Sequence, residues 1–118
     1  MSKKRLDGVK SEEIYLKHIL DEINFLIKET EGISFDIFIA DELLKRASAR
    51  SLEIIGEAVK NISSDFKKRH ADIEWKKLAG LRDKIIHGYF GVNWDIVWDV
   101  IKNKMPELKQ AIQNMTSK

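Results

Sequence analysis

The sequence predicts an all-α fold, an antiparallel helical bundle of four to five helices. The 118 residues include six glycines and a single proline, and 43% of them are hydrophobic and 34% charged. So few helix breakers in a chain rich in Leu, Ile, Lys and Glu disfavour a turn-rich β fold. Apolar residues also recur every three to four positions in several segments, which is the period of a helix face. A chain of this length fits one domain with a modest core.

Composition excludes several classes of protein. The chain has no cysteine, which excludes a disulfide scaffold, a thiolate metal site and a cysteine nucleophile, and which fits a cytoplasmic location. No uncharged apolar run is long enough to span a membrane, and no apolar signal core follows the basic first residues. The net charge of +2 is too small to indicate nucleic-acid binding by bulk charge, so any polyanion site must be local.

The chain is expected to begin with a basic flexible arm over residues 1–10, followed by a single helical domain over residues 11–118. Ser11 is the expected N-cap of the first helix, because two acidic residues follow it in the first turn. Gly32 is expected to end this helix. Its apolar face comprises Ile14, Ile19, Leu20, Ile23, Leu26 and Ile27.

A second helix is expected from Ser34 to Ile62. Its broad stripe of apolar and small residues allows a partner helix to approach closely. The opposite face carries Arg46, Arg50, Glu53 and Glu57. These charges are expected to pair with one another on the helix surface. Alternatively, Arg46 and Glu57 line a cleft.

A third long helix is expected to begin after Asp72, its candidate N-cap. It should end near His87 or Gly88, since a glycine often follows the last helical residue. The apolar side of this helix comprises Trp75, Leu78, Leu81, Ile85 and Ile86.

A fourth helix is expected over residues 94–104, with Asn93 as its N-cap. Pro106 is expected to start a fifth, short helix, because proline suits the first helical turn. Short connections between the helices predict antiparallel neighbours and hence a bundle.

The third helix contains one anomaly. Arg82 lies inside its apolar stripe, and a guanidinium is costly to bury without a partner. Arg82 must therefore meet a carboxylate or line a wet cleft. Asp83 and His87 are spaced i, i+4 on the adjoining face, where a carboxylate can hydrogen-bond an imidazole. Tyr89 would return to the Arg82 side if the helix continued.

These residue types suit phosphodiester cleavage. A neutral imidazole can take the proton of an RNA 2′-hydroxyl near pH 7, and an arginine can bind the phosphate and stabilise its developing charge. The products would be a 2′,3′-cyclic phosphate and a 5′-hydroxyl, without a metal ion. Two other interpretations stay open. The helix dipole alone favours Arg and His at a helix C-terminus, so their presence does not by itself indicate catalysis. The chain could be a plain structural bundle, or it could bind a nucleotide at Arg82 without cleaving anything.

The pattern Arg82-x4-His87-x-Tyr89 resembles the signature of the HEPN superfamily, in particular of the HepT-like toxins of prokaryotic toxin–antitoxin pairs. Its flanks are similar to that family as well: the segment leading from Trp75 into Asp83, the stretch 47–62 with Ile55-Gly56-Glu57-Ala58, and the segment 90–98 with its two tryptophans. The similarity covers nearly the whole chain.

The resemblance implies a metal-independent, cofactor-free endoribonuclease that works as a homodimer, with two motif helices facing one cleft. Arg82 and His87 would be catalytic, and Asp83 would orient or support His87. A small nucleotidyltransferase antitoxin of the MntA type would attach AMP to Tyr89. That modification would add bulky negative charge where the RNA phosphate should bind.

The remaining candidates are expected to be structural. His18 and His70 lack metal-ligand spacing to His87 or to a pair of carboxylates, so no metal site is predicted. The three tryptophans lie at helical spacing among apolar residues and are expected in the core or in a dimer interface.

Overall fold

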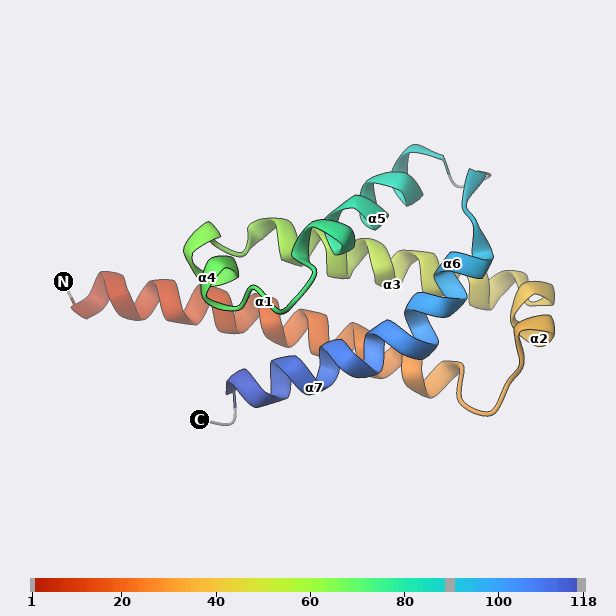
Figure 1. The fold of residues 1–118 in the computed structure, drawn as a ribbon, viewed down its shortest axis with the longest axis horizontal. Coiled ribbons are helices and arrows are strands. Elements are labelled where there is room, and N and C mark those ends of the chain that lie inside the picture. Colours follow the sequence, from red (N-terminus) through yellow and green to blue (C-terminus); the bar gives the residue numbers. More distant parts are fainter. Residues whose placement is uncertain (1, 89–90, 117–118) are drawn as a thin grey trace.

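The computed structural model describes residues 2–88 and 91–116, and every regular element in these ranges is a helix. In chain order they are α1 (Ser2–Glu29), α2 (Phe35–Ala40), α3 (Glu42–Asn61), α4 (Ser64–Arg69), α5 (Trp75–His87), α6 (Trp94–Asp99), the π-helical turn η2 (Val100–Lys104) and α7 (Met105–Thr116). The predicted all-α bundle is confirmed (Figure 1). Within the described ranges, no helix has the length and apolar character that crossing a membrane requires.

The long helices α1 and α3 pack against each other, and each carries one further helix. α7 packs on α1, and α5 packs on α3; Figure 1 draws α5 above α3, with α1 and α7 below. Apolar side chains of these four helices, together with residues of α2, α6 and η2, form one buried core. Its fully buried members include Ile19, Ile23, Leu26, Phe38, Leu52, Ile55, Ile85, Val97, Ile101 and Ile112.

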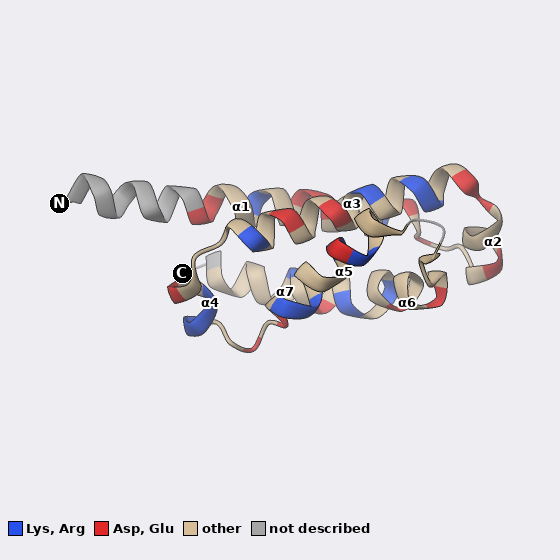
Figure 2. Ribbon diagram, turned by 90° about the horizontal axis from the view of Figure 1, so that it is seen from above, with Lys and Arg blue, Asp and Glu red and all other residues tan. Residues whose placement is uncertain are grey.

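Charged residues of both signs are interspersed over the helices, and neither sign dominates the molecule (Figure 2). This distribution agrees with the net charge of +2. Attraction for a polyanion must therefore come from a local arrangement of side chains.

The first helix differs from the prediction at its start. α1 begins at Ser2 and not at Ser11, because the residues before Ser11 include no proline and are mostly good helix formers. The basic flexible arm over residues 1–10 stays a prediction, although the backbone of residues 2–10 is helical. After α1 the chain reverses at Gly32, whose φ of +74° favours glycine.

The predicted second helix is in fact two helices. Ser34 caps α2 as expected, and its side chain accepts a hydrogen bond from Ile37 N. The helix then breaks at Asp41, whose backbone is extended and whose carboxylate accepts a hydrogen bond from Leu44 N at 2.9 Å. The prediction of one unbroken helix is wrong because this aspartate caps a new helix in preference to continuing the old one.

The start of α5 also differs from the prediction. Glu74, and not Asp72, occupies its N-cap, and no side chain caps the helix there. Instead, the indole of the first residue, Trp75, donates a hydrogen bond to the carbonyl of His70 at 3.0 Å. A buried tryptophan anchored in this way fixes the start of the helix without a capping side chain.

The C-terminal helices follow one another directly along the chain. Asn93 caps α6 as expected, by accepting hydrogen bonds from Asp95 N and Ile96 N. The predicted break before Pro106 is absent, because α6, η2 and α7 follow one another without an interruption. A proline has no N–H to donate, and the turn that precedes it is a π-helix, in which the N–H of Met105 reaches Val100 O.

The tryptophans lie where the apolar pattern places them. Trp75 is buried, and Trp94 and Trp98 pack against the core. The ring of Phe38 lies 4.9 Å from that of Trp98 and 6.1 Å from that of Trp94. One predicted core residue of α5 is wrong, since Ile86 is 45% exposed.

Candidate active site

A glycine in α3 lets the motif helix approach closely. A Cβ added at Gly56 would lie 2.2 Å from the Cβ of Arg82 and 3.0 Å from the carbonyl oxygen of Leu78. Real carbon atoms in contact lie about 3.5–4.0 Å apart. The absence of a side chain at Gly56 therefore sets how deeply Arg82 sits against α3.

Arg82 meets two carboxylates, which is one of the two outcomes that its place in an apolar stripe predicted. Its Nη2 lies 3.2 Å from Glu57 Oε2 on α3, and its Nη1 lies 3.0 Å from Asp83 Oδ1. The side chain is 22% exposed, and its buried Nε has no hydrogen-bond partner among the described residues. The hydrogen bond to Asp83, followed by that to Glu57, raises the pKa of the guanidinium above its ordinary value. Arg82 is thus a cation held in place by two carboxylates, and it has further N–H groups that are not hydrogen-bonded to them.

Asp83 is shared between two cations. Its Oδ1 accepts hydrogen bonds from Arg82 Nη1 and from Nζ of Lys60, which lies on α3. These bonds, with that of Lys60 as the larger, lower the pKa of the Asp83 carboxyl. The carboxylate is therefore ionised and committed to Arg82 and Lys60.

His87 is the last residue of α5 and is exposed. Its Nδ1 lies 2.7 Å from the main-chain carbonyl oxygen of Asp83. The expected hydrogen bond between the Asp83 carboxylate and the imidazole is wrong, because the ring bonds the main-chain carbonyl of Asp83, while Oδ1 of the carboxylate accepts from Arg82 and Lys60. A carbonyl can only accept, so Nδ1 carries the proton and Nε2 of the neutral ring keeps a lone pair.

The cleft-lining candidates from α3 separate in the structure. Glu57 contacts Arg82, whereas Arg46 pairs with Glu42 at 3.4 Å near the start of α3. Arg50 and Glu53 pair on the helix surface as predicted. Of the two residues offered as alternatives for a cleft, Glu57 contacts Arg82 and Arg46 does not, and the sequence offered no means of separating them.

Two contributors to the site were not among the predicted site residues. Gly56 belongs to the motif-like stretch of α3, but its role depends on the distance to another helix. Lys60 follows Glu57 by one helical turn, so the two present opposite charges on one face of α3. That charge pattern was visible in the sequence, although its partners on α5 were not.

Tyr89, the predicted modification site, lies outside the described residues. Beside His87, a cavity of about 410 Å³ opens between the end of α5 and the start of α6. Its lining includes Lys84 and His87 from α5 and Asn93 and Ile96 from the other side. The exposed His87 therefore lies at the edge of a space that a ligand can enter.

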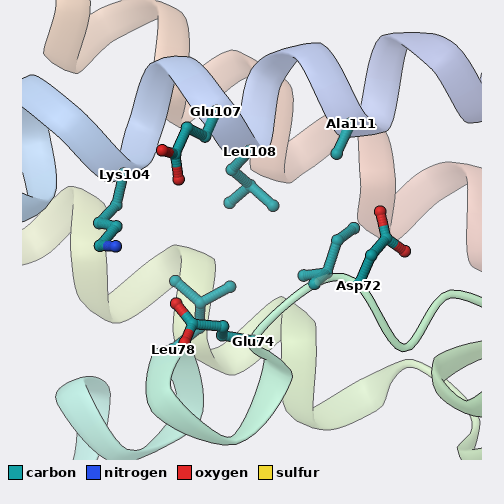
Figure 3. A pocket seen from close by; sticks show the side chains of 8 residues that line it. Asp72, Glu74, Leu78, Lys104, Glu107, Leu108 and Ala111 are labelled. Atoms are coloured by element: carbon teal, nitrogen blue, oxygen red, sulfur yellow. The ribbon is translucent and has the colours of Figure 1, made fainter.

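A smaller cavity of about 90 Å³ lies elsewhere, between the start of α5 and α7. Figure 3 shows the carboxylates of Asp72, Glu74 and Glu107 around it, with Lys104 at one side. More negative than positive charge makes this cavity a poor site for a phosphodiester. Among the described residues, no cluster of three or more His, Asp or Glu side chains is arranged to hold a metal ion.

Comparison with known proteins finds a family whose model, described as "Ribonuclease HepT-like", matches residues 19–115. A protein of Caldanaerobacter subterraneus subsp. tengcongensis, described as a "Putative RNase", is 49% identical over 93% of this chain and 98% of its own length. A "Probable ribonuclease HepT" of Thermococcus cleftensis is 41% identical over 90% of this chain and 96% of its own. No solved structure matches significantly.

Proposed function

The chain belongs to the HepT-like ribonuclease family, and from this premise we propose that it is a metal-independent endoribonuclease with Arg82 and His87 as its catalytic residues. The observation that carries the proposal is the pairing of an anchored guanidinium with an imidazole whose Nδ1 donates to a main-chain carbonyl. The first group binds a phosphate, and the second presents an unprotonated Nε2 as a base.

The chemistry follows from these two groups. His87 Nε2 takes the proton of an RNA 2′-hydroxyl, and O2′ attacks the adjacent phosphorus while the bond from phosphorus to O5′ breaks. Arg82 binds the non-bridging oxygens and stabilises the charge that develops on them. The products are a 2′,3′-cyclic phosphate and a 5′-hydroxyl. Asp83 supports the reaction by holding Arg82 through its carboxylate and His87 through its carbonyl.

The leaving O5′ must gain a proton, and one His87 cannot be the base and the acid in the same step. We therefore propose a homodimer in which two motif helices face one cleft and the second His87 supplies this proton. Exposed apolar side chains near this end of the molecule, Ile86 and Ile96, are 45% and 51% exposed, and they suit burial against a second copy. The cysteine-free chain would act in the cytoplasm.

The test of catalysis is cleavage of RNA by the purified protein in the presence of a chelator. His87→Ala should abolish cleavage, and Arg82→Lys should reduce it strongly, because a lysine cannot bind a phosphate through two parallel bonds. Lys77→Gln is a control, since it removes an exposed ion pair with Glu74 near the start of α5 and outside the site. Equal products and rates from wild type and His87→Ala would exclude the assignment. Tight nucleotide binding without cleavage would favour a non-catalytic nucleotide-binding partner.

We also propose that the protein is a toxin, neutralised by a cognate MntA-like nucleotidyltransferase that attaches AMP to Tyr89. The proposal rests on the resemblance and on the position of Tyr89 two residues after His87. An AMP group there adds a phosphodiester negative charge where the substrate phosphate should bind. Mass spectrometry of protein co-expressed with the nucleotidyltransferase should find Tyr89 modified by AMP and the protein inactive. An unmodified Tyr89 in an inactive complex would contradict this mechanism.

A further inference from the structure

Lys60 is a charged residue at the site that the cleavage scheme does not use. It lies on α3 one turn after Glu57, and its Nζ contacts Asp83 Oδ1 at 2.5 Å. The same oxygen accepts the hydrogen bond from Arg82 Nη1 at 3.0 Å. Glu57 and Lys60 thus hold the Arg82–Asp83 pair from two positions on the facing helix.

The charges around Arg82 show why this contact matters. Arg82 meets two carboxylates, Glu57 and Asp83, so these three groups alone would carry a net negative charge. Such a cluster repels a phosphodiester, even though it contains an arginine. Lys60 adds the positive charge that makes the cluster neutral. Both Lys60 and Asp83 are about two-fifths exposed, at 40% and 43%, so the balance operates at the surface where a substrate would arrive.

The contact also restricts the geometry of the guanidinium. Glu57 holds Arg82 at Nη2, and Asp83 holds it at Nη1. Asp83 is adjacent to Arg82 in the sequence and on the same helix, so it can hold Nη1 steadily only if its own carboxylate is fixed. Lys60 holds Oδ1 of that carboxylate from α3, while the His87 ring bonds the main-chain carbonyl of Asp83.

We propose that Lys60 is a positioning residue for phosphate binding at Arg82, which acts by anchoring and neutralising the Asp83 carboxylate. The inference rests on the proposed function in that Arg82 is taken as the phosphate-binding group. It adds a residue of α3 that never needs to touch the reacting atoms.

The test compares Lys60→Gln and Lys60→Arg with the control Lys77→Gln. Lys77 also forms an exposed ion pair, with Glu74 at 2.7 Å, so the control removes one surface pair without touching the site. The ligand is a fully 2′-O-methylated RNA oligonucleotide, which has phosphodiesters but no 2′-hydroxyl to react. Its Kd is measured by fluorescence anisotropy at low and at high salt.

Lys60→Gln should raise the Kd about two- to fivefold at low salt, the range expected for one exposed ion pair. The difference from wild type should shrink at high salt, because the repulsion by Asp83 is then screened. Lys60→Arg should restore binding, and Lys77→Gln should bind as wild type does. NMR titration should find the Asp83 carboxyl pKa higher in Lys60→Gln than in wild type, in which Lys60 lowers it.

Equal binding by Lys60→Gln and wild type would overturn the proposal, as would a loss that Lys60→Arg does not restore or that salt does not change. The proposed function is tested separately, with unmodified RNA. If wild type binds the methylated RNA in a Lys60-dependent way but cleaves no RNA, the catalytic proposal fails and the role of Lys60 stands. If it cleaves RNA while its binding is independent of Lys60, the reverse holds.

Discussion

Gly56→Ala is the sharpest perturbation of the contact between α3 and α5. It adds one methyl group, whose carbon would lie 2.2 Å from Arg82 Cβ and 3.0 Å from Leu78 O. An ordinary carbon–carbon contact needs about 3.5–4.0 Å, so Arg82 and its helix must retreat by about 1.5 Å. The nearest atoms belong to the backbone and to a Cβ, which cannot swing aside as the end of a long side chain can.

The expected cost combines two opposing effects. Overpacking a close contact destabilises by about 1–3 kcal/mol, whereas replacing a helical glycine by alanine stabilises by about 0.5–1 kcal/mol. Gly56→Ala should therefore lower the free energy of unfolding by about 1–2 kcal/mol. Gly80→Ala is the matched control, because Gly80 also lies within a helix and a Cβ there meets nothing within 4 Å. The control should stabilise by about 0.5–1 kcal/mol.

Denaturant unfolding of wild type, Gly56→Ala and Gly80→Ala, all at one protomer concentration, measures whether each variant is less or more stable than wild type. RNA cleavage should fall about 100-fold in Gly56→Ala, the effect of displacing a catalytic group by about 1 Å, and should be unchanged in Gly80→Ala. If both alanine variants gain stability and cleave RNA as wild type does, the close approach of α3 and α5 does not depend on Gly56 and the reasoning fails.

Three further predictions concern charge and capping. Hydrogen bonds lower the pKa of Asp83, so its contribution to stability is present above the ordinary pKa of 3.8 and is lost as the pH falls through the lower folded value. Asp83→Asn should remove this part of the acid dependence when unfolding is measured as a function of pH. An unchanged loss of stability in acid would contradict the pairing. Asp41→Ala removes the side chain that caps Leu44 N and should destabilise by about 1 kcal/mol in the same assay, whereas no loss would show that the cap is dispensable. Arg82→Lys should keep one ion pair but lose the two parallel N–H groups of the guanidinium. RNA binding measured by anisotropy should weaken, while the secondary structure measured by circular dichroism stays the same. Equal binding would show that the positive charge alone suffices.

The parts of the fold that sequence reasoning reached are those with local signals. Ser34 and Asn93 cap helices because their short polar side chains follow loops and precede apolar repeats, and α5 ends at His87, one of the two positions expected for its end. The break at Asp41 was not predicted, because an aspartate can lie within a helix or cap the start of a new one. The π-helical turn before Pro106 escaped because it depends on how the chain accommodates a missing N–H.

The site divides in a similar way. The place of Arg82 in an apolar stripe predicted either a carboxylate partner or a wet cleft, and the structure shows it in contact with Glu57 and Asp83. The choice of Glu57 over Arg46 could not be read from the sequence, because the register of α3 against α5 is set in three dimensions by Gly56. The sequence predicted the carboxylate of Asp83 as the partner of His87, whereas the imidazole bonds the main-chain carbonyl of the same residue. Oδ1 of the carboxylate accepts from Lys60, which lies 23 positions earlier.

The hydrogen bond from His87 to a main-chain carbonyl has a consequence for how this protein can lose activity. Every residue has that carbonyl, so no single side-chain replacement at position 83 deletes the acceptor, and the imidazole is buffered against mutation. The weak point is the last helical turn itself, because fraying of that turn moves the carbonyl away from the ring. Warming should therefore abolish RNA cleavage at a temperature at which the rest of the bundle is still folded.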